Sequence, residues 1–88
     1  MSWKIEVKPT AEKKYGKLDK TTRKRIKKAL EELEREENPL LHRNVQPLTG
    51  KLHGDYRLRL GDWRILFTPE KEKKFIYIYA ILPRGNSY

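Results

Sequence analysis

The segment 55–67 alternates apolar and polar residues, a pattern that predicts a β-hairpin. A two-residue turn at Gly61-Asp62 places Leu60 opposite Trp63, and the pairing continues back along both strands. Directly paired residues point the same way, so one face is apolar: Tyr56, Leu58, Leu60, Trp63, Ile65 and Phe67. The other face carries Arg57, Arg59 and Arg64. Like charges placed opposite each other destabilise a sheet, so these arginines either point into solvent or hold an anion together.

The residues before the hairpin predict one strand and two helices. The alternation of 3–7 indicates a short, half-buried strand that ends at Pro9. A short helix is expected over Thr10–Lys17, with its first residue as the cap. A longer helix follows Asp19 and ends at Asn38-Pro39. Its apolar positions have the spacing of one buried stripe: Thr22, Ile26, Ala29, Leu30 and Leu33.

The remaining segments complete the expected fold. Segment 40–51 contains Pro47 and Gly50 and is expected to be a connection. Segment 68–73 is charged and predicts a turn, and 74–82 is rich in β-branched and aromatic residues and predicts the last strand. The expected fold is α+β, in the order β-α-α-β-β-β, with a four-stranded, mostly antiparallel sheet and two helices on one face. A single domain is expected to span residues 1–88.

The register of the last strand decides which aromatic residues reach the arginines. An even-numbered turn centred between Lys71 and Glu72 pairs Phe67 with Ile76, whereas an odd turn shifts the pairing by one. The even register brings two tyrosines to the arginine face, Tyr77 beside Leu66 and Tyr79 beside Arg64. The tail then leaves the sheet at the end where Arg59 lies. Two more side chains are expected to converge there, Arg84 and Tyr88.

Charge is abundant and unbalanced. The chain has 21 Lys and Arg against 12 Asp and Glu, and the net charge of +9 favours a nucleic acid, an acidic protein or an anionic surface as partner. The absence of cysteine excludes disulfides and thiolate metal sites. No segment reaches the roughly 20 apolar residues that span a bilayer, so a cytoplasmic protein without metal or cofactor is expected. His42 and His53 lack the spacing of a metal site or a triad and are interpreted as structural or incidental.

The longer predicted helix carries its basic residues early and its acidic residues late, which is the reverse of what the helix dipole favours. One interpretation is a face that is simply solvated. The alternative is contact with phosphates, for which the candidates are Arg23, Lys24 and Lys27.

A cluster of arginines suits a phosphodiester, because each guanidinium presents fixed donors and stays charged at physiological pH. When RNA is cleaved by its own 2′-hydroxyl, negative charge grows on the phosphoryl oxygens, and preorganised cations stabilise it. Arginine is a poor base, with a pKa above about 12. Tyr88 is therefore the best candidate to accept the proton, and the alternative is a base supplied by a partner or by solvent. Tyr77 and Tyr79 either stack on a nucleotide base or serve packing.

The hairpin sequence 56–67, the connection 47–52 and the late Pro83-Arg84-Gly85 together resemble the RelE/ParE toxin superfamily, most closely its archaeal-type RelE members. The resemblance implies a toxin of a type II toxin-antitoxin system that enters the ribosomal A site and cuts mRNA. It also implies a RelB-like antitoxin as partner. The catalytic residues that it implies are Arg57, Arg59, Arg64, Arg84 and Tyr88, the first two standing where bacterial RelE usually has lysines. The RNA-contacting residues are predicted to be Tyr77, Tyr79, Lys51, Arg23, Lys24 and Lys27.

Two alternatives remain open. ParE-like members of the same superfamily share the fold but act on DNA gyrase. The third possibility is a basic RNA- or ribosome-binding module that does not cut. For such a module, Arg84→Ala weakens binding in a salt-dependent way and leaves no cleavage to lose.

Overall fold

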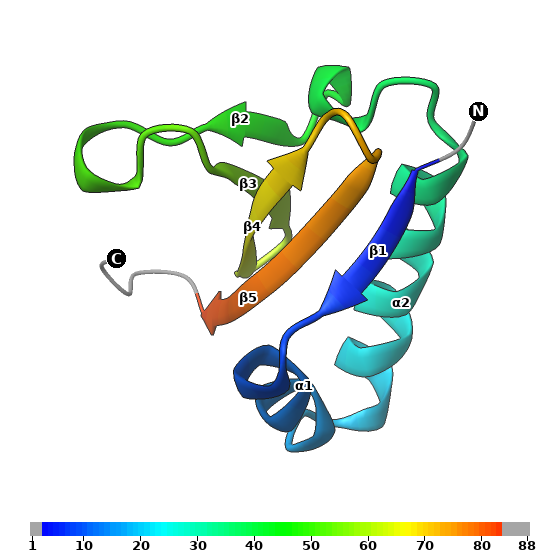
Figure 1. The fold of residues 1–88 in the computed structure, drawn as a ribbon. Coiled ribbons are helices and arrows are strands. Elements are labelled where there is room, and N and C mark those ends of the chain that lie inside the picture. The colour runs from blue at the N-terminus through cyan, green and yellow to red at the C-terminus, as the bar shows by residue number, and fades with distance from the viewer. Residues whose placement is uncertain (1–2, 84–88) are drawn as a thin grey trace.

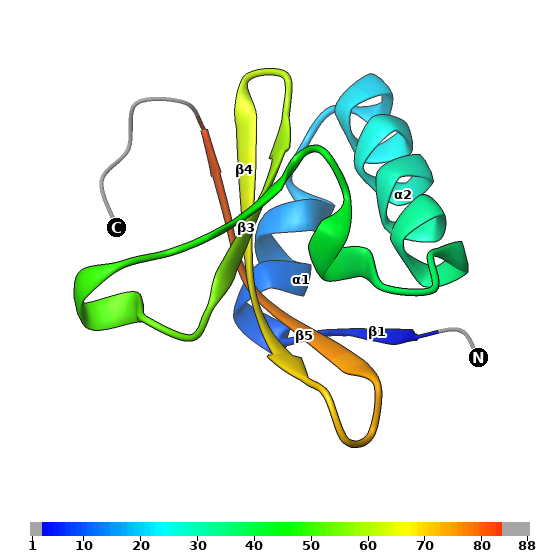
Figure 2. The same ribbon diagram turned by 90° about the horizontal axis from the view of Figure 1, so that it is seen from above.

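A computed structural model describes residues 3–83, so Met1, Ser2 and residues 84–88 lie outside it. Two helices and five strands follow in the order β1 (Lys4–Val7), α1 (Pro9–Gly16), α2 (Lys20–Arg35), β2 (Val45–Pro47), β3 (Tyr56–Leu60), β4 (Trp63–Glu70) and β5 (Phe75–Pro83). Two short 3₁₀ helices flank β2, namely η1 (Pro39–Leu41) and η2 (Gly50–Leu52). The fold is α+β, as predicted, and both helices lie on one side of the sheet (Figures 1 and 2).

The sheet has five strands in the order β1-β5-β4-β3-β2, so the prediction of four strands is wrong. The additional strand, β2, lies within the segment that was expected to be a connection, and Val45 pairs with Leu58 and Pro47 with Tyr56. It has only three residues and ends in a proline, which an edge strand tolerates because its outer side needs no ladder hydrogen bond. At the opposite edge β1 runs parallel to β5, and every other pairing is antiparallel.

The hydrophobic core lies between the sheet and the helices. From α2 it takes Ile26 and Leu33, both completely buried, with Ala29 and Leu30 partly buried against the core. This confirms the predicted stripe except for Thr22, whose hydroxyl donates to the Asp19 carboxylate instead. From the sheet it takes the alternate positions that point toward the helices: Leu58, Ile65, Phe67, Ile76, Ile78 and Ile81. Trp3 is buried in the same core, and its indole nitrogen donates to the backbone oxygen of Glu37 at 3.1 Å. This bond ties the start of the sheet to the end of α2.

The helix starts follow local chemistry. Asp19 caps α2, because its carboxylate accepts a hydrogen bond from the backbone nitrogen of Thr22 at 3.1 Å, as predicted. The cap predicted for α1 is wrong: Thr10 lies inside the helix, which begins at Pro9. Proline suits the first helical position because its fixed φ is already helical and its missing N–H is not needed there.

The hairpin of β3 and β4 has the predicted register, with Leu60 opposite Trp63, Arg59 opposite Arg64 and every further pair in place. The turn has Gly61 at φ +57°, while Asp62 has no positive φ. Glycine at the first of two central positions is typical of the type II′ turn, whose twist matches that of paired strands.

The predicted pairing of β4 with β5 is wrong. Phe67 lies opposite Ile78 instead of Ile76, because β4 continues through Glu70 and the turn is centred one residue later than expected, which shifts the pairing by two residues. Phe67 is the last residue of β4 that pairs with β3, because β3 begins at its partner Tyr56. Pro69 lies beyond that pair, so β3 needs no hydrogen bond from the missing N–H of Pro69. A bulge then shifts the register between Phe67 and Leu66 and leaves Tyr79 as the extra residue on β5.

Candidate arginine site

Three arginines lie on the face of the sheet turned away from the helices, as the hairpin register predicted. Arg59 and Arg64 are cross-strand partners, and Arg57 lies two residues farther along β3. Arg59 is exposed, whereas Arg57 and Arg64 are half-buried. The guanidinium of Arg57 donates to the side-chain oxygen of Gln46 at 2.7 Å. The short strand β2, which sequence did not predict, therefore holds the innermost arginine in place.

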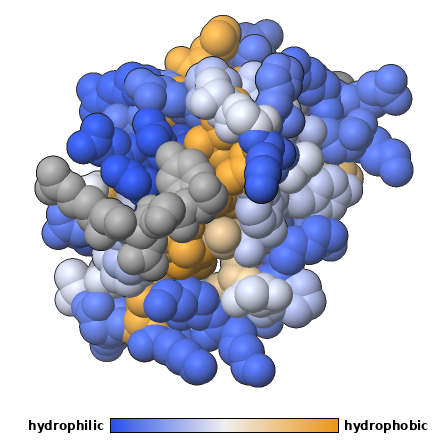
Figure 3. Space-filling model, turned by 90° about the vertical axis from the view of Figure 1, so that its left-hand side faces the viewer, coloured by the Kyte–Doolittle hydropathy of each residue, from blue (hydrophilic) through white to orange (hydrophobic). Residues whose placement is uncertain are grey.

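The floor of this face is apolar. Leu66 pairs with Arg57 and so points to the same side of the sheet, and it is 1% exposed. Leu48, in the segment after β2, is also buried, and neither leucine belongs to the main core cluster. Figure 3 looks onto this side of the molecule and shows a strip of hydrophobic residues between hydrophilic ones. Guanidiniums beside such a surface are less screened by water than on a fully exposed helix.

Asp55 is a hydrogen-bond acceptor at the edge of the site that sequence reasoning missed. Its carboxylate accepts hydrogen bonds from the hydroxyls of Thr68 at 2.9 Å and Tyr79 at 2.8 Å. Burial of the phenol, followed by the hydrogen bond and the negative charge of Asp55, raises the pKa of Tyr79 above its ordinary value. Tyr79 thus keeps its proton and is unsuited to be the base. The sequence signal that could have indicated this acceptor is the position of Asp55, a carboxylate directly before the strand that carries Arg57 and Arg59.

Neither Tyr77 nor Tyr79 lies where the sequence predicted it. The bulge places Tyr79 against Asp55 rather than beside Arg64, whose partner on β5 is Leu82. Tyr77 lies opposite Thr68, where its ring stacks on Phe75 with centroids 5.6 Å apart and 7° between the planes. The ammonium of Lys8 lies 4.7 Å from the centre of the Tyr77 ring. The predicted pairings of Tyr77 with Leu66 and of Tyr79 with Arg64 are therefore wrong.

Three of the predicted basic contacts lie apart from the arginine face, because Arg23, Lys24 and Lys27 belong to α2, on the helical side of the sheet. Lys51 is exposed in η2, which extends from the side of the sheet opposite the helices (Figure 2). Arg84 and Tyr88 fall outside the described residues, so their place in the site stays a prediction.

Residues 3–83 contain no cluster of three or more His, Asp or Glu side chains arranged to hold a metal ion. In the same part of the chain, no helix is both long and apolar enough to pass through a bilayer.

Comparison with solved structures shows the same fold in several toxins. The archaeal RelE–RelB complex from Pyrococcus horikoshii is 28% identical, with 99% of this chain and 100% of that one covered and a TM-score of 0.81. The RelBE2 toxin-antitoxin complex from Mycobacterium tuberculosis is 24% identical, with 98% and 95% covered and a TM-score of 0.82. The isolated RelE toxin of E. coli is 24% identical, with 98% and 88% covered and a TM-score of 0.76.

No curated protein sequence matches the chain. A family model does, that of the ParE toxin of the type II toxin-antitoxin system parDE, and the match extends over residues 5–88. Because it includes the arginine hairpin and both helices, it covers all the elements that build the site. The chain therefore belongs to the ParE toxin family, within the RelE/ParE superfamily, and is a toxin of a type II toxin-antitoxin system.

Proposed function

We propose that the protein is a ribosome-dependent endoribonuclease that cuts mRNA in the A site. The observation that carries the proposal is the pairing of Arg59 with Arg64, with Arg57 next to them on the same face. A sheet accepts such repulsion at some cost, and a phosphate bound between the guanidiniums offsets it. The apolar floor formed by Leu66 strengthens this attraction because it displaces water.

In the proposed reaction the 2′-oxygen of the message attacks the adjacent phosphorus. The bond from phosphorus to the 5′-oxygen breaks, which leaves a 2′,3′-cyclic phosphate and a 5′-hydroxyl. A base takes the proton of the 2′-hydroxyl, and the departing 5′-oxygen gains one. Arg57, Arg59, Arg64 and Arg84 are assigned to the phosphoryl oxygens, and Tyr88 to proton transfer. Among the described groups, Tyr79 is unsuited to that proton transfer, because burial and its hydrogen bond to Asp55 raise its pKa.

The test mixes purified protein with programmed ribosomes and maps the cuts by primer extension. Cuts confined to the A-site codon are expected, and Arg64→Ala should slow them by about 100- to 1,000-fold, the usual loss for one transition-state donor. Arg35→Ala is the matched control, because Arg35 is an exposed arginine at the end of α2, on the helical side of the sheet. Intact message with the unaltered protein on programmed ribosomes argues against the proposal.

A second candidate function is inhibition of DNA gyrase, which the match to the ParE family favours. A supercoiling assay with the same protein preparation distinguishes the two activities. Inhibited supercoiling beside intact message would assign the chain to ParE-like action. If neither assay responds, binding to ribosomes without cutting is the remaining interpretation.

We also propose an antitoxin partner, because solved relatives with this fold are RelE–RelB complexes. The net charge of +9 favours an acidic antitoxin. Co-expression with the neighbouring open reading frame, followed by co-purification, tests this directly.

A further inference from the structure

The positive charge of the protein is concentrated in one helical hairpin rather than on the arginine face. Residues 13–28, which span the second half of α1 and the first half of α2, carry nine Lys and Arg and one Asp. The surplus of eight accounts for nearly all of the net charge of +9. Residues 29–37 carry the opposite sign, with five Glu against one Arg. Helix α2 is therefore basic at its beginning and acidic at its end.

The basic half of α2 presents a lysine stripe to solvent. Ile26 is completely buried and defines the inner side of the helix. Four exposed lysines lie on the outer side, at i, i+4, i+7 and i+8: Lys20, Lys24, Lys27 and Lys28. Like charges four residues apart repel, and cations near a helix start oppose its dipole. Within residues 3–83 no carboxylate lies within 4.0 Å of these lysines to compensate.

Arg25 connects the lysine stripe to the arginine face. A Cβ atom built on Gly61 would lie 2.7 Å from a guanidinium nitrogen of Arg25, so this side chain covers the β3–β4 turn. Figure 2 shows the start of α2 beside the tip of this hairpin. Arg59 and Arg64 lie two residues back from the turn, about 7 Å along each strand. Cations thus continue from α2, across the turn, to the proposed phosphate site.

We propose that the lysine stripe and Arg25 dock on the phosphate backbone of double-helical RNA, which in the cell is ribosomal RNA. This docking would orient the arginine face toward the message, and it rests on the proposed function. The stripe itself consists only of lysines, a residue type depleted in protein interfaces. An apolar groove lined by Tyr15 and Leu30 borders it at Lys27 alone. No aromatic side chain lies among the four lysines for the bases of single-stranded RNA to stack on. A convex row of lysines suits a regular array of phosphates.

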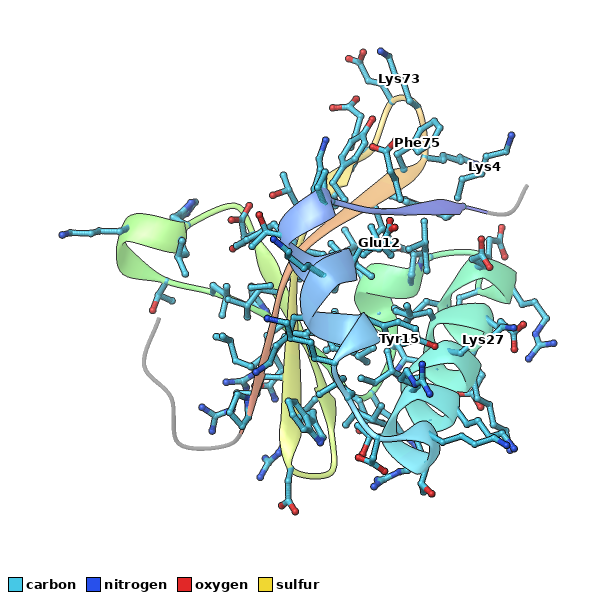
Figure 4. The ribbon with its side chains drawn as sticks, turned by 90° about the horizontal axis from the view of Figure 1, so that it is seen from below. Lys4, Glu12, Tyr15, Lys27, Lys73 and Phe75 are labelled. Carbon is cyan, nitrogen blue, oxygen red and sulfur yellow. The ribbon has the colours of Figure 1, made fainter. Side chains whose placement is uncertain are left out.

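The test compares two triple variants with the same change in charge. One replaces Lys24, Lys27 and Lys28 by Gln, and the control replaces three exposed lysines outside α2: Lys4, Lys71 and Lys73. Figure 4 shows Lys4 and Lys73 near Phe75, away from Lys27 on α2. Binding to purified vacant ribosomes, to a short RNA duplex and to its single strand is measured at several salt concentrations. Circular dichroism and the unfolding midpoint establish that both variants are folded.

The stripe variant should bind ribosomes and the duplex about tenfold more weakly, with a salt slope shallower by two to three, and the control should bind like the parent. Equal losses in the two variants, an unchanged salt slope, or a loss confined to single-stranded RNA would each overturn the proposal.

The cleavage assay separates docking from chemistry. Docking requires that the stripe variant raise the half-saturating ribosome concentration, and a lower rate at saturating ribosomes with unchanged half-saturation contradicts it. If the parent protein does not cut at all, the proposed function fails, while the binding comparison still decides the docking proposal.

Discussion

The Gly61→Ala variant tests the link between backbone conformation and the arginine hairpin. Gly61 has φ +57°, a region that costs an L-residue about 1–2 kcal/mol. The new methyl would also meet Arg25 at 2.7 Å, but a guanidinium at the end of a flexible side chain can move away. We expect a loss of about 1–2 kcal/mol in the free energy of unfolding. For a domain of this size, each kcal/mol lowers Tm by about 4–8 °C.

Thermal and urea unfolding followed by circular dichroism measure this loss, and two variants serve as controls. Gly16→Ala adds a methyl at the end of α1, where no atom lies within 4 Å and φ is not positive, so stability should rise by about 0.4–1 kcal/mol. Introducing Gly61→Ala into an Arg25→Ala background separates strain from contact. The loss should persist there. If it disappears, the contact with Arg25 caused it, and if Gly61→Ala is as stable as the parent, the turn does not need a positive φ.

Three further predictions concern packing and titration. Phe67→Ala removes a completely buried ring and should cost about 3–5 kcal/mol, whereas Leu41→Ala, at a side chain 80% exposed, should stay within about 0.5 kcal/mol; equal urea midpoints for the two would contradict the assigned core. Tyr79→Phe removes the hydrogen bond to Asp55 and should cost about 1–2 kcal/mol at neutral pH. Because the pKa of Tyr79 is raised in the fold, the contribution of its phenol to stability is complete below pH about 10 and is lost as pH rises above that value. Between pH 9 and 11 the variant should therefore lose less stability than the parent in the same urea titration. The hydrogen bonds of Thr22 lower the pKa of Asp19, so the contribution of this cap to stability is present above the ordinary Asp pKa and is lost as pH falls through the lowered value. Asp19→Ala should therefore flatten the loss of α2 helicity in acid. An unchanged acid profile would show that the cap does not contribute.

Local patterns predicted the elements whose neighbours are close in sequence. The β3–β4 register followed from a two-residue turn and strict alternation, because a slip by one would bury Arg59 in the core. The stripe of α2 followed from helical spacing. The RelE/ParE resemblance, drawn from the hairpin and its flanking segments, is confirmed by the family match over residues 5–88.

Tertiary context decided what the patterns missed. Three residues ending in Pro47 form a strand only because β3 offers a free edge, and nothing local marks them. The bulge at Tyr79 is stabilised by a hydrogen bond to Asp55, which lies 24 residues earlier, so alternation within β5 could not reveal it. Arg25 was overlooked because its importance depends on its contact with Gly61.

The parallel pairing of β1 with β5 affects how the chain folds during synthesis. Lys4 pairs with Phe75, so the first strand to be made must wait for the last. β5 also lies between β1 and β4, which means that the sheet lacks an inner strand until β5 has been translated. Contacts so distant in sequence slow folding. The sheet that carries the arginine face can therefore close only after β5 has been synthesised, so the site cannot form on the hairpin of β3 and β4 in advance of the last strand.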